Sequence, residues 1–308
     1  MNVLLTGASS FSGYWFARRL AEAGHTVTCA FPRAEQGYAG DVRARRVAAL
    51  TPLVRRVFEA PFGADAFLDL VRAEGFDMLA HHAAAVGNYR APDYDMLGAV
   101  AQNTHRFADV VAEMKARGLR GIVATGSVFE QDEGVGEAPR RAFSLYGLSK
   151  GLSFQIIRYH AGALGLKLTK FVLPNPVGPY EEPRFGHYLV QTWRRGEAAE
   201  VRTPDYVRDN LPITLAADRY AAVVAETPAQ ATACRVVAPS GYVESQGAFA
   251  ERLGRELGPR LGLAARVVLG RQTDFSEPLM RVNTESVLAH APPEAVRGFW
   301  DAYARFYE

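Results

Sequence analysis

Tyr146 and Lys150 are the two residues of this chain whose types and spacing best suit chemistry. Four positions apart on a helix, their side chains would share one face, a single turn apart. A free phenol has a pKa of about 10, and a nearby ammonium favours the phenolate and lowers that pKa toward neutrality. The pair therefore suits the proton transfer that accompanies hydride transfer at a carbon bearing a hydroxyl or a carbonyl. The same spacing also occurs by chance on solvated surface helices. Whether this pair is catalytic therefore has to be judged from the elements around it.

A glycine-containing turn close to the N-terminus predicts a dinucleotide-binding site. Residues 3–5 form an apolar run typical of a buried strand, and the apolar spacing of residues 14–23 predicts a helix. Between them, Gly7 permits a tight turn and Gly13 permits close packing. Backbone N–H groups at the start of the helix, at Ser9, Ser10 and Phe11, would meet a pyrophosphate.

Composition and charge exclude several classes of protein. The chain has 308 residues, of which 48% are hydrophobic and 22% charged, a balance typical of globular proteins. Its net charge of +2 is too small to indicate binding to nucleic acid or to an anionic membrane. The two cysteines, Cys29 and Cys234, predict neither a disulfide framework nor a metal site. Without a signal-peptide pattern or an apolar run of membrane-spanning length, we expect a cytoplasmic protein.

Strand and helix patterns alternate through the first half of the chain, which predicts an α/β fold with a doubly wound parallel sheet. The expected strands span residues 3–5, 26–31, 54–58, 77–81, 121–125, 166–173 and 235–238. The expected helices span residues 14–23, 64–74, 95–118, 146–162, 187–195 and 213–226. We expect a Rossmann domain from residues 1–173 and about 212–238, and a smaller lobe from residues 174–211 and 239–308.

Six motifs follow one another along nearly the whole chain. They are T-G-A-S-S-F-S-G at 6–13, close to T-G-x-x-G-x-x-G; His82-Ala83-Ala84, close to H-x-A-A; Asn103 on the next helix; A-T-G-S-V-F-E at 124–130, close to S-S-x-x-V-Y-G; P-N-P-V-G at 174–178, close to F-N-P-V-G; and V-R-D-N at 207–210, close to R-D-F/Y. Together they resemble the extended short-chain dehydrogenases/reductases, in the group of nucleotide-sugar epimerases, dehydratases and reductases. Ser10 stands where that family has its middle glycine, so it would shift the pyrophosphate or donate a hydrogen bond to it.

The resemblance implies roles for the matched residues. Tyr146 would exchange a proton with the reacting oxygen, while Lys150 would tune Tyr146 and bind the nicotinamide ribose. Thr125 would hydrogen-bond the reacting oxygen, with Ser127 as the alternative hydroxyl. The cofactor-binding set would be Gly7, Ser9, Ser10, Phe11, Gly13, Arg33, His82, Ala83, Ala84 and Asn103, together with Tyr146 and Lys150.

The resemblance also places substrate-binding residues in the smaller, substrate-binding lobe. Asn175 would meet the phosphates or the sugar, and Arg208 would bind the pyrophosphate through its bidentate guanidinium. Arg271 is a second candidate for that role. Each assignment has an ordinary structural alternative. Asn175 could be a capping asparagine, Arg208 could form a surface salt bridge, and His82 could be a packed histidine at the end of a strand. We expect residues 181–185 at the lip of the substrate site, where they would determine specificity.

Two departures from the family pattern narrow the function. The dehydratases carry an Asp-Glu pair where this chain has Gly126 and Ser127, so dehydration is disfavoured, although Glu130 lies just beyond. The second expected strand leads into Arg33 without the acid that binds the adenosine ribose in NAD-dependent members. Because Arg33 could pair with a 2′-phosphate, NADP is the favoured cofactor and NAD the alternative.

The favoured function is therefore an NADP(H)-dependent reductase of a keto group on a nucleotide-activated deoxysugar. The alternative is a nucleotide-sugar 4-epimerase with tightly bound NAD, which the F-N-P-V-G likeness favours. A non-catalytic dinucleotide-sensing protein is a third hypothesis, which the presence of both Tyr146 and Lys150 disfavours. The resemblance further implies a homodimer through a four-helix bundle built from residues 95–117 and 149–163.

Overall fold

The computed structural model describes residues 1–40, 42–89 and 91–308, which form two compact units. Unit 1 contains Met1–Gln131, Ala142–Leu173 and Ala217–Val237, and unit 2 contains Asp132–Arg141, Pro174–Ala216 and Ala238–Glu308. Each unit buries a hydrophobic core of its own. Within the described ranges, no helix is both long enough and apolar enough to span a membrane.

Unit 1 is built on a seven-stranded parallel sheet. Its strands are β1 (Asn2–Thr6), β2 (Thr26–Ala30), β3 (Arg55–Val57), β4 (Met78–His81), β5 (Gly121–Ser127), β7 (Lys167–Leu173) and β11 (Cys234–Val237). Their spatial order is β11-β7-β5-β4-β1-β2-β3, which confirms the predicted doubly wound sheet. β1, β4 and β5 are buried along almost their whole length, which explains their continuous apolar sequences. Successive strands are added in one direction from β1 to β3 and in the opposite direction from β4 onward, so the switch point lies between β1 and β4, where ligands bind to sheets of this kind.

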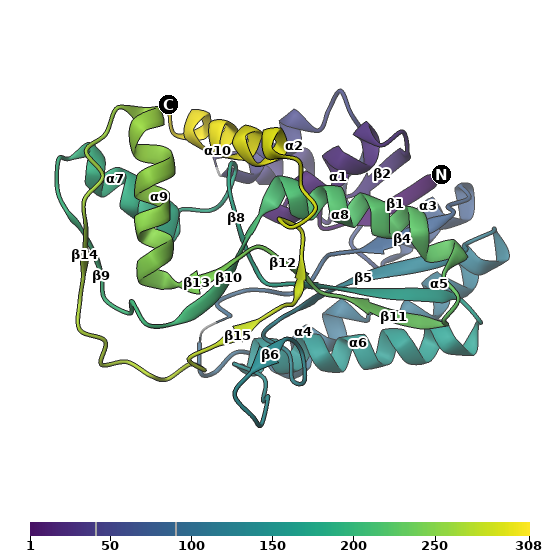
Figure 1. Ribbon diagram of the computed structural model, residues 1–308. Coiled ribbons are helices and arrows are strands. Elements are labelled where there is room, and N and C mark those ends of the chain that lie inside the picture. The colour runs from purple at the N-terminus through teal and green to yellow at the C-terminus, as the bar shows by residue number, and fades with distance from the viewer. Residues whose placement is uncertain (41, 90) are drawn as a thin grey trace. The chain divides into compact units, whose positions relative to one another are not determined.

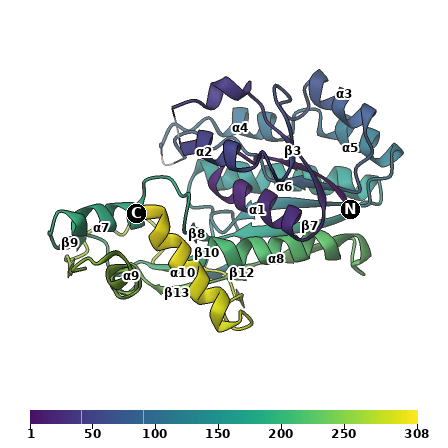
Figure 2. The ribbon, with the colours of Figure 1, turned by 90° about the horizontal axis from the view of Figure 1, so that it is seen from above.

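Helices cover both faces of this sheet, as Figure 1 shows with α8 on one side and α6 on the other. The helices of unit 1 are α1 (Phe11–Glu22), α2 (Val42–Ala49), α3 (Asp65–Ala73), α4 (Met96–Asn103), α5 (Phe107–Ala116), α6 (Leu145–Ala163) and most of α8 (Ile213–Glu226), with short 3₁₀ turns at Glu35–Tyr38 and Thr227–Ala229. On one face, Phe16 of α1 stacks on Tyr220 of α8 with ring centres 3.9 Å apart. On the other, α3 and α5 lie side by side (Figure 2) and share one core cluster with α6.

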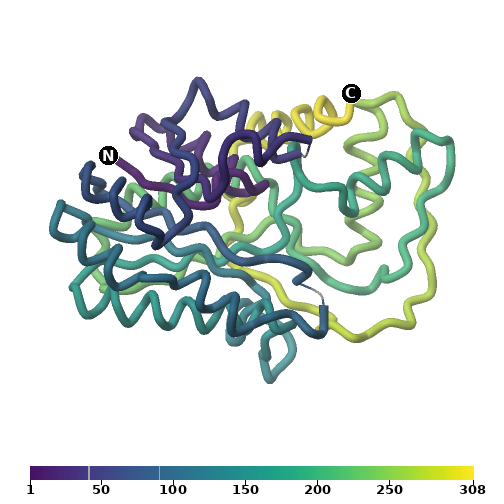
Figure 3. Tube along the Cα trace, turned by 180° about the vertical axis from the view of Figure 1, so that it is seen from behind, coloured from purple at the N-terminus to yellow at the C-terminus, as the bar shows by residue number. Residues whose placement is uncertain are grey.

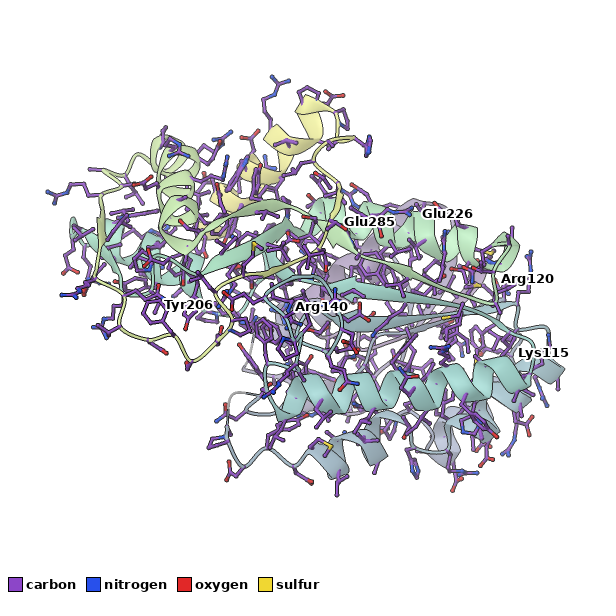
Figure 4. The ribbon with its side chains drawn as sticks, turned by 60° about the horizontal axis from the view of Figure 1, so that its bottom comes forward. Lys115, Arg120, Arg140, Tyr206, Glu226 and Glu285 are labelled. Atoms are coloured by element: carbon purple, nitrogen blue, oxygen red, sulfur yellow. The ribbon has the colours of Figure 1, made fainter. Side chains whose placement is uncertain are left out.

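Ion pairs fix the C-terminal end of α8. Glu226, labelled in Figure 4, binds Arg219 from the preceding turns of the helix and Arg235 from β11, each at 2.8 Å. The prediction of a helix over 213–226 is confirmed to the residue.

The predicted long helix over 95–118 is wrong, because the chain breaks between α4 and α5. Arg106 has a left-handed backbone conformation with φ of 47°, and its guanidinium binds Asp65 at 2.7 Å and Asp109 at 3.2 Å. The break also frees the carbonyl oxygen of Asn103 to accept a hydrogen bond from His81 Nε2 at 3.2 Å. A continuous helix would use that oxygen for its own ladder, so the break serves a contact made between distant parts of the sequence.

Unit 2 has a core formed mainly by three helices, and Figure 3 shows the last of them, in yellow, ending the chain. The helices are α7 (Phe185–Arg194), α9 (Gln246–Leu261) and α10 (Pro293–Tyr307). The strands are β6 (Val135–Gly136), β8 (Asn175–Val177), β9 (Ala199–Val201), β10 (Val207–Pro212), β12 (Pro239–Ser240), β13 (Tyr242–Ser245), β14 (Val267–Leu269), β15 (Arg281–Val282) and β16 (Glu285–Ser286). We predicted α7 to within two residues but neither α9 nor α10.

A buried carboxyl group ties α10 to the segment before α7. The side chain of Glu181 accepts hydrogen bonds at Oε1 from the hydroxyls of Tyr303 (2.6 Å) and Tyr307 (3.0 Å). Only 5% of the surface of Glu181 is exposed. Burial raises the pKa of Glu181 to about 7, although both tyrosines, the Gly178 N–H and the charge of Arg184 oppose that shift.

We expect this carboxyl group to make the stability of the protein depend on pH. Because Glu181 holds its proton more tightly in the folded chain, its contribution is complete below about pH 4.5 and is lost as the pH rises to about 7. The loss should reach about 3 kcal/mol, at about 1.4 kcal/mol for each unit of pKa. The free energy of unfolding would be measured in urea at pH 4.5 and at pH 8. Between these two values the wild type should lose about 3 kcal/mol relative to Glu181→Gln. Glu182→Gln, at the neighbouring and more exposed position, is the control. Equal pH dependence in all three proteins would contradict the assignment.

Candidate active site

Two glycines and a capping serine shape the turn between β1 and α1. Gly7 has φ of +80°, and a Cβ there would lie 2.8 Å from the backbone nitrogen of Ala83. A Cβ on Gly13 would lie 2.1 Å from the Gly7 carbonyl oxygen. Ser10, at the middle-glycine position, donates to that oxygen (2.8 Å) and accepts from the Gly13 N–H (3.1 Å), so it caps α1. A turn so bare of side chains at a helix N-terminus fits a pyrophosphate.

A buried arginine that we did not predict supports the same turn. Arg46 on α2 donates from Nη1 to the carbonyl oxygen of Ser9 at 3.3 Å, and its guanidinium lies 5.8 Å from the centre of the Phe11 ring. The residue is fully buried. In the sequence, its arginine-rich segment 43–46 is typical of a solvated helix face, which is why α2 and Arg46 were both overlooked. Ser9 and Phe11 are thus held in place from outside the turn.

Arg33 lies beyond the end of β2, where the sequence placed it as a candidate for the 2′-phosphate. Its side chain is exposed, with the guanidinium 5.9 Å from the centre of the Tyr38 ring. Glu35, the nearest acid along the chain, forms an ion pair of 2.5 Å with Arg56. Glu35 is therefore already engaged by a cation at this end of the sheet.

The segment after β4 is fixed to β1 by one threonine. Thr6 Oγ1 accepts hydrogen bonds from the backbone N–H groups of His82 (3.1 Å) and Ala83 (3.0 Å), and Ala84 follows. His81 is buried and contacts Thr6 Oγ1 through Nδ1 at 3.3 Å, and burial lowers its pKa to about 4. The four-residue pattern H-x-A-A fits the chain from His81, a signal we did not use when we named only His82.

Asn103 joins three elements around this segment. Its side-chain oxygen accepts the Ala85 N–H at 2.7 Å, its amide nitrogen donates to Ser153 Oγ of α6 at 3.2 Å, and its backbone oxygen accepts from His81. The side chain is therefore committed to the protein on both its oxygen and its nitrogen. Asn103 thus braces α6 against the end of β4, and it also lines the small cavity beside Lys150.

Lys150 and Tyr146 lie on α6 as the sequence predicts. Lys150 Nζ donates to the carbonyl oxygen of Thr125 at 2.6 Å, which fixes the ammonium at the end of β5. Burial lowers the pKa of Lys150, the Glu130 carboxylate opposes that shift, and the Lys170 charge adds to it. The Tyr146 ring lies 5.8 Å from that of Tyr89 and is half-buried. A small cavity of about 10 Å³, enough for roughly one water molecule, adjoins Lys150 and Thr125.

The two candidate hydroxyls of β5 have different surroundings. Thr125 is buried, and its Oγ1 lies 3.0 Å from Nδ1 of His82. Ser127 Oγ accepts the backbone N–H of Phe129 at 3.2 Å, as a serine in a strand-end turn commonly does. Both residues stand on the same side of the strand, so both remain candidates for contact with a reacting oxygen.

Glu130 is committed to a buried ion pair. Its Oε2 lies 2.5 Å from Lys170 Nζ, with the two side chains 1% and 5% exposed, and its Oε1 accepts the Ser127 N–H at 2.7 Å. Gly126 makes room for this pair, because a Cβ there would lie 2.6 Å from Lys170 Cε. Glu130 therefore does not supply the acid or base that Gly126 and Ser127 lack, which strengthens the argument against dehydration.

The predicted substrate residues all belong to unit 2. Asn175 Nδ2 donates to Asn210 Oδ1 at 2.7 Å across the β8–β10 pair. Arg208 binds Glu277 at 2.7 Å, and its guanidinium lies 4.4 Å from the ring centre of Tyr206, which Figure 4 labels. Arg271 is exposed in the segment after β14. The salt-bridge alternative for Arg208 is thus present, and a ligand phosphate would have to compete with Glu277.

Solved structures of nucleotide-sugar epimerases share this fold over the entire chain. A mutant of UDP-glucuronic acid 4-epimerase from Bacillus cereus, in complex with a fluorinated UDP-sugar and NAD, is 15% identical with a TM-score of 0.74, covering 99% of this chain and 98% of its own. UDP-glucose 4-epimerase from Thermotoga maritima is 14% identical with a TM-score of 0.72, covering 100% and 98%. The UDP-Glc/GlcNAc 4-epimerase from Campylobacter jejuni is 15% identical with a TM-score of 0.69, covering 99% and 98%.

The family comparison agrees with the motifs and the sheet order. No curated protein matches the sequence. The model of the NAD dependent epimerase/dehydratase family matches residues 3–211, which is more than half of the chain and includes every motif described above. The predicted family and the prediction of an enzyme are confirmed, and the chain belongs to the NAD dependent epimerase/dehydratase family.

Proposed function

We propose that the protein is a nucleotide-sugar 4-epimerase that uses NAD. The proposal replaces our sequence-based preference for an NADPH-dependent reductase. It is supported by three solved structures of similar fold that are named as 4-epimerases, of which the Bacillus cereus enzyme is in complex with NAD. Among the features of the chain itself, it rests above all on Lys150 held against Thr125, with Tyr146 one turn earlier on α6.

Tyr146 is the acid and base of the proposed reaction. Lys150, a half-buried cation, favours the phenolate of Tyr146, which then takes the proton from the C4 hydroxyl and later returns it to the same oxygen. Thr125 or Ser127 hydrogen-bonds that oxygen while its charge changes. A bound nicotinamide dinucleotide would supply the hydride chemistry at C4 of the sugar, as an acceptor from one face of that carbon and a donor to the other. Gly7, Ser9, Ser10, Phe11 and Gly13 would hold its pyrophosphate at the start of α1.

Substrate binding and assembly complete the proposal. Asn175 and Arg208 would contact the nucleotide phosphates or the sugar, with Arg271 as a second cation. A homodimer through α4 and α6 is supported by exposed apolar residues on these helices: Leu97 is 72% exposed and Tyr159 is 73% exposed. Sedimentation of the purified protein would measure this directly.

We expect the purified protein to carry NAD and to act without added cofactor. The nucleotide released by denaturation would be identified by mass, and UDP-glucose, UDP-N-acetylglucosamine and UDP-glucuronic acid would be offered separately, with the C4 epimers resolved by NMR. An epimer formed from any of them supports the proposal. Protein that is empty, binds NADPH more tightly than NADH and consumes NADPH with keto-sugar nucleotides would contradict it and restore the reductase, with Arg33 on the 2′-phosphate.

A further inference from the structure

One imidazole ring connects the phosphate-binding turn to the hydroxyl at the end of β5. His82 Nε2 lies 3.1 Å from Ser10 Oγ and 3.0 Å from Ser12 Oγ, both at the start of α1. Its other nitrogen, Nδ1, lies 3.0 Å from Thr125 Oγ1. Thr6 holds the His82 backbone, and the ring packs edge-on against Phe16 with centres 5.0 Å apart. The position of the ring is therefore fixed, and only its hydrogen can change place.

Ser10 determines which nitrogen carries that hydrogen. Its own hydroxyl proton is donated to the Gly7 carbonyl oxygen, so toward His82 it can only accept. A ring hydrogen on Nε2 satisfies this contact, and Nδ1 then accepts the hydroxyl proton of Thr125. Burial and the nearby charge of Lys150 lower the pKa of His82 to about 3, so the ring is neutral and carries one hydrogen.

Ser12 permits the opposite arrangement, because a hydroxyl can donate as well as accept. If Ser12 donates to Nε2, the ring hydrogen lies on Nδ1 and is donated to Thr125 Oγ1, which releases the hydroxyl proton of Thr125 for another acceptor. The two arrangements contain the same number of protons, one on the ring and one on each hydroxyl. They differ in whether Thr125 directs its proton to His82 or to a reacting oxygen.

We propose that His82 is a positioning residue that sets the direction of the Thr125 hydroxyl proton. Ser10 favours the withheld state, in which Thr125 donates this proton to His82. Ser12 allows the released state, in which Thr125 can donate it to a reacting oxygen. The consequence for turnover rests on the proposed function, in which Thr125 hydrogen-bonds the reacting oxygen. The Tyr220 side chain also lies within hydrogen-bonding reach of the Thr125 side chain. Burial raises the pKa of its phenol, so the phenol keeps its proton and can donate it to Thr125 Oγ1 in either arrangement, which leaves the Thr125 proton for His82 or the reacting oxygen.

Nitrogen-15 NMR of the ligand-free protein tests the placement of the ring hydrogen without any substrate. We expect His82 to carry it on Nε2 in the wild type and in Ser12→Ala, and to shift toward Nδ1 in Ser10→Ala. His81 is an internal control, since its Nε2 faces the Asn103 carbonyl oxygen and must keep its hydrogen in every variant. A hydrogen on Nδ1 of His82 in the wild type, or an unchanged tautomer in Ser10→Ala, would overturn the proposal.

Turnover tests the consequence separately. Ser12→Ala should lock the withheld state and lower kcat about 10-fold or more, because a donor to the reacting oxygen is lost. The KM for the nucleotide sugar should stay within about twofold, and the affinity for the dinucleotide is measured alongside. In a His82→Phe background, which keeps an aromatic ring beside Phe16, the same Ser12→Ala change should have no further effect on kcat. An equal loss in both backgrounds would overturn the role of His82. If no epimerisation is found at all, the proposed function is wrong. The NMR experiment still tests the placement of the His82 ring hydrogen, because it does not depend on activity.

Discussion

Replacing Tyr146 with phenylalanine is expected to lower kcat by about 10²- to 10⁴-fold, the usual contribution of a positioned general acid and base. The change removes one hydroxyl and leaves the ring in contact with Tyr89. Lys150 keeps its hydrogen bond to the Thr125 carbonyl oxygen, and the turn at Gly7 is untouched. Binding of the dinucleotide should therefore persist, so the loss would appear in turnover and not in cofactor affinity.

The same helix offers a matched control. Tyr159 lies on α6 thirteen positions later and is 73% exposed, so Tyr159→Phe makes the same chemical change at the surface. Initial rates of epimer formation and dinucleotide affinity would be measured for both variants. If Tyr146→Phe kept more than about a tenth of the activity, another group would have to carry the proton. If neither variant nor the wild type turned over any sugar nucleotide while all bound dinucleotide, the sensing hypothesis would regain weight.

Local patterns sufficed to predict the sheet and the start of the site. The buried runs of β1, β4 and β5 and the glycines at 7 and 13 each have a conformational requirement that is visible within a few residues. The placement of Tyr146 and Lys150 on one helix follows from their spacing alone. Strand order then follows from alternation with helices, because right-handed crossovers leave few arrangements.

The contacts that were missed are those made between distant parts of the chain. The break between α4 and α5 depends on His81 reaching the Asn103 carbonyl oxygen, 22 residues away. Arg46 is buried and contacts Ser9 and Phe11 of the turn before α1 and the start of α1, which no local pattern of α2 indicates. Glu130 looked like a spare acid near the site, and only the fold brings Lys170 of β7 to it. The roles of Thr125, Arg208 and the other site residues likewise remain proposals, because they depend on ligands.

The ion pair between Glu130 and Lys170 should produce the largest stability effect of any single substitution near the site. Removing one partner leaves the other charge buried, so Glu130→Ala is expected to cost about 3–5 kcal/mol of unfolding free energy. It would also free the Ser127 N–H, which the Glu130 carboxylate now accepts. An exposed glutamate provides the comparison: Glu22→Ala, which breaks contacts with both Arg18 and Arg19, should cost about 1 kcal/mol or less.

A double replacement separates two quantities: the free energy lost when one buried charge is left without its partner, and the stabilisation that the intact ion pair provides. Glu130→Leu combined with Lys170→Met removes both charges and keeps apolar volume beside Phe154, whose ring centre lies 4.4 Å from Lys170 Nζ. Because two buried charges lose hydration that their attraction only partly restores, we expect this variant to recover most of the stability lost in Glu130→Ala. Urea unfolding of the three proteins measures this. A double variant as unstable as the single one would mean that the Ser127 contact, rather than the charge of Lys170, determines the loss, and that Glu130 stabilises the turn after β5 chiefly as a hydrogen-bond acceptor.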